Sequence, residues 1–201
     1  TEFGDRMLRL SWSAGPFNNA PITEYRVSLV DAASGGALST TSCTVTVGCQ
    51  VATPGNGPAN AVRISVVAVN AIGDSAPVQL PGSIWSDVIP PPPAAVAATP
   101  VDHGLRVTWR KPAQTSGSPI DSYVVTVGGT SVTVSAPESD PPGTSYVRII
   151  ANDGIANGTP IAFSVSARNK APNTLATWNQ AGGTATPAGA PLVLASPTAS
   201  A

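Results

Sequence analysis

The chain has 201 residues, of which 42% are hydrophobic and only 10% are charged, with 10 basic against 11 acidic side chains. The balanced charge and the lack of any basic run argue against nucleic-acid binding, and no apolar stretch reaches the roughly 18 residues that a membrane helix needs. The hydrophobic share excludes a disordered chain, and the length allows two domains of about 100 residues each.

In chain order, the predicted elements are short strands in which apolar and polar residues alternate. Residues 7–12, MLRLSW, place Leu8, Leu10 and Trp12 on one face. The same alternation continues in residues 25–30, 62–70, 105–109, 123–127 and 161–169. A period of two is typical of half-buried strands. No segment sustains the spacing of an amphipathic helix, and 21 prolines punctuate the chain, so the sequence predicts an all-β protein.

This strand pattern occurs twice. The motif Pro-Ile-x-x-Tyr ends at Tyr25 and again at Tyr123, 98 positions later. Trp12 and Trp109 lie 97 positions apart. A nearly constant offset indicates two copies of one domain. With about seven short strands separated by turn signals, each copy is expected to form a β-sandwich.

Both copies resemble the fibronectin type III family. The residues that carry the resemblance are Trp12, Pro21, Ile22, Tyr25, Val66, Ala68, Asn70 and Gly73 in the first copy, and Trp109, Pro119, Ile120, Tyr123, Val165, Ala167 and Asn169 in the second. The resemblance implies two tandem immunoglobulin-like β-sandwiches with Trp12, Tyr25, Trp109 and Tyr123 in their cores. We expect an extended arrangement, because Pro90–Pro93 should form a stiff polyproline II segment.

The repeat also defines the expected domains. The first sandwich covers residues 1–90, the second covers 91–190, and residues 191–201 form a linker or tail rich in Pro, Ala, Ser and Thr. Only eleven residues precede Trp12, fewer than separate the proline run from Trp109. We therefore expect the first strand of the first copy to be shortened or displaced, with a partly unprotected edge.

Both copies depart from the family at one position. Where the family usually carries a tyrosine at the start of its sixth strand, this chain has Val62 and Ile161. The hydrogen bond that this tyrosine makes to nearby backbone is therefore expected to be missing from both copies.

Cys43 and Cys49 are the only cysteines, six positions apart in CTVTVGC. A straight strand would hold their Cα atoms about 20 Å apart, so a disulfide requires the chain to bend back, which Gly48 allows. The residues are compatible with a disulfide, which we favour, or with two buried thiols. A disulfide would imply an oxidising compartment. The chain resembles copies from secreted or surface actinobacterial proteins, which carry similar cysteine pairs.

Candidate catalytic groups are scarce. His103 is the single histidine and lies in a predicted loop, and Glu138 and Asp140 fall in a predicted turn, APESDPPG. Two cysteines and one histidine are too few for a zinc site, and no glycine-rich loop leads into a helix. The sequence therefore predicts no catalytic residue, no cofactor, no metal site and no enzyme.

Exposed aromatic residues are the remaining candidates for contact with a partner. Phe17 lies in the loop before the third strand, and Trp85 and Trp178 lie late in their copies. Alternatively, the two tryptophans pack against their own sandwich or a neighbouring domain. The partners expected are a protein or polysaccharide surface and neighbouring domains of the parent chain, without nucleic acid or membrane insertion.

The functional prediction is a non-catalytic structural spacer or interaction module of a larger secreted or cell-surface bacterial protein. Two alternatives share this fold: accessory domains of a polysaccharide-degrading enzyme, and an adhesin module that binds a protein ligand through its loops. A coplanar exposed pair of tryptophans would favour the polysaccharide interpretation. The expected location is extracellular or at the cell surface.

Overall fold

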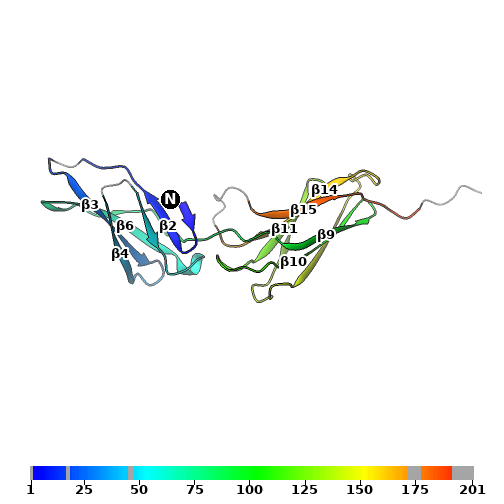
Figure 1. The fold of residues 1–201 in the computed structure, drawn as a ribbon, viewed down its shortest axis with the longest axis horizontal. Helices are drawn as coiled ribbons and strands as arrows, with labels where there is room; N and C mark the ends of the chain where they lie inside the picture. Colours follow the sequence, from blue (N-terminus) through cyan, green and yellow to red (C-terminus); the bar gives the residue numbers. More distant parts are fainter. Residues whose placement is uncertain (1, 17–18, 45–47, 172–177, 192–201) are drawn as a thin grey trace, which may run out of the picture. The chain divides into compact units, whose positions relative to one another are not determined.

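The computed structural model describes residues 2–16, 19–44, 48–171 and 178–191 of the chain. These residues divide into two compact units (Figure 1). Unit 1 comprises Thr1–Pro90, Gln114–Ile120 and Arg168–Trp178, and unit 2 comprises Pro91–Ala113, Asp121–Ala167 and Asn179–Ala201. Apart from one 3-10 turn at Pro58–Asn60, every regular element of the described residues is a β-strand, which confirms the predicted all-β class.

Unit 1 contains two sheets. One has the order β1-β2-β5, with β1 at Glu2–Gly4, β2 at Met7–Ser11 and β5 at Gly48–Ala52. The other has the order β4-β3-β6-β7, with β4 at Ala37–Cys43, β3 at Ile22–Asp31, β6 at Val62–Asn70 and β7 at Gly73–Asp74. A short strand, β8 at Val78–Gln79, also pairs with β6. This sheet order is that of an immunoglobulin-like sandwich.

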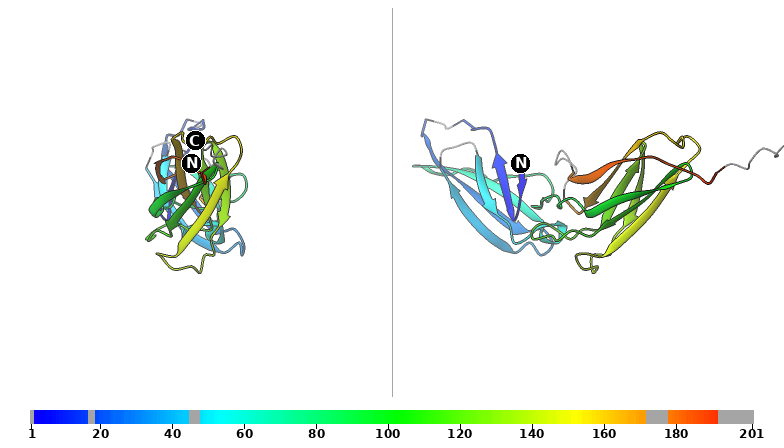
Figure 2. Two further views of the ribbon diagram at one scale, coloured as in Figure 1. Left: turned by 90° about the vertical axis from the view of Figure 1, so that its right-hand side faces the viewer. Right: turned by 45° about the vertical axis from the view of Figure 1, so that its right-hand side comes forward.

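Unit 2 repeats the arrangement with seven strands (Figure 2). One sheet has the order β13-β10-β9, with β13 at Ser145–Ala151, β10 at Gly104–Arg110 and β9 at Ala94–Val101. The other has the order β12-β11-β14-β15, with β12 at Thr130–Ser135, β11 at Ser122–Val127, β14 at Ile161–Arg168 and β15 at Gln180–Ala185.

The alternation read from the sequence produces both cores. In unit 1, Leu8 and Leu10 of β2 face Tyr25, Val27 and Leu29 of β3, and all five side chains are buried. Burying an apolar side chain of this size contributes about 1.5–3 kcal/mol. The stability of each unit therefore comes mainly from the inward faces of a few strands.

The aromatic residues expected in the cores behave differently in the two units. Trp109 and Tyr123 of unit 2 are 1% and 0% exposed, and their ring centroids lie 5.4 Å apart. Trp12 contacts Tyr25 at 5.1 Å, but Trp12 is only half-buried. Unit 2 also places Tyr146 of β13 in a stack on Trp109, at 5.8 Å and an interplanar angle of 15°, which the sequence did not indicate.

The first strands of the two units differ in length. The pairing of β1 with β2 covers only three residues of β1, from Glu2 opposite Arg9 to Gly4 opposite Met7. In unit 2, β9 has eight residues and follows β10 as far as Arg110. Among the described residues, β1 therefore pairs with a shorter part of β2 than β9 does with β10.

Cys43 and Cys49 form a disulfide, with their Cα atoms 5.9 Å apart. Cys43 ends β4 and Cys49 lies in β5, so the bond joins the two sheets of unit 1. Gly48 begins β5, and a Cβ there would come within 2.8 Å of the backbone oxygen of Leu10. A glycine at this position therefore permits the close approach of β5 to β2.

Candidate functional site

Within the described residues, no group of three or more His, Cys, Asp or Glu side chains is placed to hold a metal ion. The same residues contain no helix long and apolar enough to cross a membrane. The side chains that could form a functional site are the titratable groups, the half-buried tryptophans and the buried polar groups.

His103 lies in the turn between β9 and β10, with a positive φ of 52°. Its Nδ1 is 2.8 Å from the backbone oxygen of Ile155, and its backbone N–H donates to Asn157 Oδ1 at 2.9 Å. Because a carbonyl oxygen only accepts, Nδ1 carries the proton in this contact. The histidine thus holds its turn against the loop that follows β13.

The acidic pair of unit 2 is also used in structural contacts. Asp140 Oδ2 accepts a hydrogen bond from the hydroxyl of Tyr146 at 2.7 Å. Glu138 offers only its backbone oxygen, which together with that of Pro137 accepts from the buried Nζ of Lys111 at 3.3 and 3.1 Å. Burial, followed by the hydrogen bond to Asp140, raises the pKa of Tyr146. Asp140 and Glu138 are thus parts of a turn held by Tyr146 and Lys111.

The strongest concentration of buried polar contacts is in unit 1. Asp87 is 0% exposed. Its Oδ1 accepts hydrogen bonds from the backbone N–H of Ser118 at 2.8 Å and of Val88 at 2.9 Å, and its Oδ2 accepts from the Ser118 hydroxyl at 2.7 Å. We call Asp87, Val88, Ser118 and Asn169 the Asp87 cluster. A buried carboxylate needs such partners, since an unpaired one carries a large desolvation cost.

Asn169 completes the Asp87 cluster. Its Nδ2 donates to the backbone oxygens of Val88 and Ser118 at 2.9 and 3.1 Å, and lies 3.4 Å from Asp87 Oδ1. Its Oδ1 accepts from the backbone N–H of Ala171 at 3.1 Å. One amide side chain therefore connects three segments that are far apart in the sequence.

Asn70 is the counterpart of Asn169 in the first copy and has part of the same role. Its Nδ2 donates to the backbone oxygen of Ala20 at 3.2 Å, and its Oδ1 accepts from the N–H of Ile72 at 2.9 Å. Ala20 stands where the second copy has Ser118, so the first copy has no hydroxyl to offer a carboxylate. The resemblance to the fibronectin type III family thus singled out both asparagines, and Asn169 is the one that contacts Asp87.

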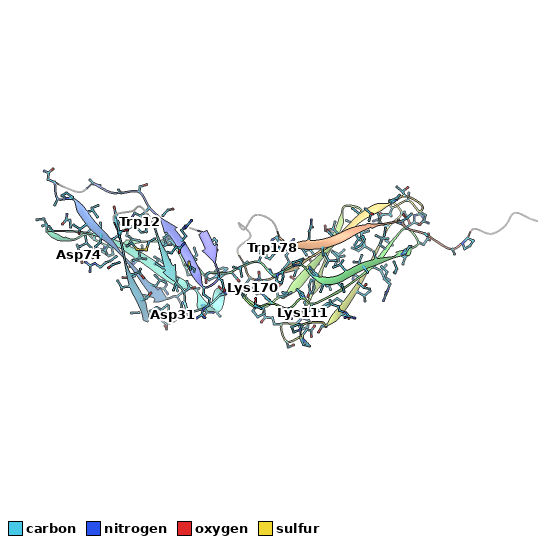
Figure 3. All side chains as sticks on the ribbon, in the orientation of Figure 1. Trp12, Asp31, Asp74, Lys111, Lys170 and Trp178 are labelled. Carbon is cyan, nitrogen blue, oxygen red and sulfur yellow. A yellow bond between two sulfur atoms is a disulfide. The ribbon has the colours of Figure 1, made fainter. Side chains whose placement is uncertain are left out.

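Both candidate tryptophans are half-buried and belong to unit 1. Trp178 is labelled in Figure 3. Trp85 Nε1 donates to the backbone oxygen of Lys170 at 3.0 Å. The guanidinium carbon of Arg168 lies 4.4 Å from the ring centroid of Trp178, and burial lowers the pKa of Arg168. Phe17, the third candidate, lies outside the described residues.

No family model matches the sequence, and no curated protein matches it. Among solved structures, a two fibronectin type III domain segment from chicken tenascin is similar over 92% of this chain and 95% of its own, with 18% identity and a TM-score of 0.50. The FN1–FN3 domains of chicken CNTN1 match with 18% identity over 94% of this chain and 64% of theirs, with a TM-score of 0.39. The central fibronectin III array of RIM-binding protein matches with 19% identity over 96% and 68%, with a TM-score of 0.34. The similarity to the tenascin segment supports the fold, two tandem immunoglobulin-like β-sandwiches of the fibronectin type III kind.

Proposed function

We propose that the chain is a non-catalytic structural spacer of a larger secreted or cell-surface protein. The observation that carries the proposal is the Asp87 cluster. A carboxylate accepts hydrogen bonds over a narrow range of distances and angles. Two apolar surfaces in contact can instead slide past each other at little cost. Such a cluster is what we expect in a structural segment that keeps one conformation.

The position of the cluster along the chain adds to this proposal. Ser118 belongs to the connection between β10 and β11, and Asn169 follows β14, yet both are parts of unit 1. The cluster therefore joins three segments of unit 1 that lie far apart in the sequence, and its hydrogen bonds restrict their movement relative to one another.

The extracellular location is proposed on the Cys43–Cys49 disulfide, because such bonds persist in oxidising compartments. We propose a bacterial, actinobacterial-like origin on the style of the sequence alone, which is rich in Ala, Pro and Thr. Between the two alternatives, the tryptophans give the polysaccharide surface little support, since Trp85 and Trp178 are half-buried and each has a contact within unit 1.

The proposal is tested by the distribution of distances between two spin labels. The labels are attached through a ketone-bearing unnatural amino acid, which leaves the disulfide intact, at Ile72 and Thr115, two exposed residues on different segments of unit 1. We expect one narrow distribution in the parent chain, a broader one in Asp87→Ala, and no change in Asp153→Ala, whose carboxylate lies on an exposed turn. A broad distribution in the parent chain would contradict the spacer function.

A further inference from the structure

The three-stranded sheet of unit 2, formed by β9, β10 and β13, contains arginines but no acidic residue. The arginines are Arg106, Arg110 and Arg148. Within the described residues, none of them lies within ion-pair distance of a carboxylate. In unit 1, Arg9 is the counterpart of Arg106 and has Glu2 directly opposite it in β1. Thr99 lies opposite Arg106 in β9, so this sheet of unit 2 carries a net positive charge.

Two of these arginines border a hollow on the outer face of the sheet. Arg106 and Arg110 are exposed there, because the buried residues that alternate with them in β10 face the core. Four residues of a strand place their Cα atoms about 13 Å apart. The hollow has a volume of about 360 Å³, and its lining includes both arginines, Thr108 between them and Val147 of β13. An acidic side chain that enters the hollow therefore meets a guanidinium group on either side.

β13 forms an edge of the same sheet, since among the described strands only β10 pairs with it. Val147 and Ile149 of β13 are 48% and 55% exposed. Next to β13, the N–H of Asn152 donates to the backbone oxygen of His103 at 3.0 Å. Because hydrogen-bonded pairs alternate in an antiparallel ladder, the even-numbered residues of β13 bond to β10, and the N–H and C=O groups of Val147 and Ile149 point away from it. The edge thus offers backbone groups and aliphatic side chains together.

The corresponding strand of unit 1, β5, has a different chemistry. Opposite Arg9 it has Gln50. Opposite Arg106, β13 has Ile149. None of the large exposed hydrophobic side chains of unit 1 lies in β5, and the disulfide of Cys49 joins β5 to β4. The cationic face and the aliphatic edge are therefore particular to unit 2 and are not a consequence of the fold.

We propose that the β13 edge binds an extended segment of a separate partner protein, in which aliphatic and acidic side chains alternate. The segment adds antiparallel to β13 and forms backbone hydrogen bonds with Val147 and Ile149. Its aliphatic side chains lie opposite these two residues, and an acidic side chain lies opposite Arg148, where opposite charges stabilise a strand pair. A further acidic side chain opposite Ser145 is directed over the outer face towards Arg110.

The charge of the sheet selects this occupant. A second copy of the chain would bring the same positive sheet against this one, and like charges on adjacent strands are destabilising. An anionic polysaccharide would pair with the arginines but would use neither the aliphatic side chains nor the free backbone groups of β13. An acidic and aliphatic polypeptide uses all three features. The spacer function does not enter this proposal.

The test uses a synthetic peptide and a charge exchange. The probe is the acetylated and amidated heptapeptide TTVEVTE, whose antiparallel register places its valines opposite Val147 and Ile149 and its central glutamate opposite Arg148. One control peptide, TTVKVTE, reverses the central charge, and a second, TTSESTE, replaces the valines. The protein variants are Arg148→Glu and Arg9→Glu, which change the net charge equally on corresponding sheets of the two units. The readout is the titration of the amide resonances of Val147 and Ile149.

We expect TTVEVTE to shift both resonances in a saturable way, and both control peptides to bind at least about tenfold more weakly. Arg148→Glu should weaken binding of TTVEVTE by at least about tenfold and should restore binding of TTVKVTE, which shows that the variant is folded. Arg9→Glu should leave binding of TTVEVTE unchanged.

Three results would overturn the proposal. The first is equal binding of TTVEVTE and TTVKVTE to the parent chain. The second is a response of the Arg106 and Arg110 resonances to dextran sulfate with no response to TTVEVTE, which would identify a polysaccharide as the ligand. The third is a shift of the Val147 and Ile149 resonances with protein concentration in the absence of peptide, which would identify a second copy as the occupant.

Discussion

Replacing Asp87 by alanine removes the acceptor on which the Asp87 cluster is built. The backbone N–H and the hydroxyl of Ser118 then lose partners at 2.8 and 2.7 Å, and the N–H of Val88 loses one at 2.9 Å. Because Ser118 is itself buried, water does not replace these partners without local opening.

The expected loss follows from two opposing contributions. Hydrogen bonds to a charged group contribute about 1.5–3 kcal/mol each, so the two from Ser118 are together worth about 3–6 kcal/mol. Removing the carboxylate also removes the cost of burying it, which offsets part of the stability lost with these hydrogen bonds. We therefore expect Asp87→Ala to lower the free energy of unfolding of unit 1 by about 2–4 kcal/mol.

Urea denaturation followed by tryptophan fluorescence measures this loss. Ser118→Ala removes the hydroxyl bond to Asp87 and the bond that the backbone N–H of Lys170 donates to the same hydroxyl at 3.1 Å, and should cost about 1.5–3 kcal/mol. Asp153→Ala changes an exposed carboxylate and should stay within about 0.5 kcal/mol of the parent chain. A loss below about 0.5 kcal/mol for Asp87→Ala would refute the reasoning, since the cluster would then contribute no more than a surface residue.

Three further predictions concern single contacts. Replacing both Cys43 and Cys49 by serine should lower the free energy of unfolding by about 2 kcal/mol, because the bond closes a short loop; equal denaturation midpoints would contradict this. Burial raises the pKa of Tyr123 above its ordinary 10.0, so its stabilising contribution is complete below pH 10 and is lost as the pH rises further. Circular dichroism across alkaline pH should show this loss in the parent chain, and an identical profile for Tyr123→Phe would contradict it. Hydrogen bonds from the side chain and backbone of Ser34 hold the pKa of Asp31 below its ordinary 3.8, so this contribution is present above pH 3.8 and is lost as the pH falls. Ser34→Ala should raise the pKa of Asp31 in an NMR titration, and an unchanged midpoint would disprove the assigned cause.

The strands and the sandwich class were predictable because alternation is a local property. Leu8 and Leu10, or Val27 and Leu29, lie on one face of a strand whatever else the chain does. The different burial of Trp12 and Trp109 was not fully predictable in this way. Both follow the same strand pattern, but the cover over Trp109 is β9, and periodicity within one strand does not report the length of its neighbour.

The Asp87 cluster could not be predicted from the sequence. Asp87 lies in a short polar stretch before the proline run, which is typical of a solvated loop. Its partners Ser118 and Asn169 lie 31 and 82 positions further on. The resemblance to the fibronectin type III family singled out Asn169, but not its contacts with Asp87 and Ser118. Tyr146 was missed for a similar reason, since its stacking partner lies in another strand.

Hydrogen exchange at the backbone amides of Val88 and Ser118 in the unmodified chain tests the central claim most directly. Both N–H groups donate to Asp87 Oδ1 in segments that are not part of any strand. If the Asp87 cluster holds these segments in solution, their amides should exchange as slowly as those of the core strands β3 and β6. Exchange as fast as that of the exposed turn at Asp153 would show that the cluster does not persist, and would remove the basis of the spacer function.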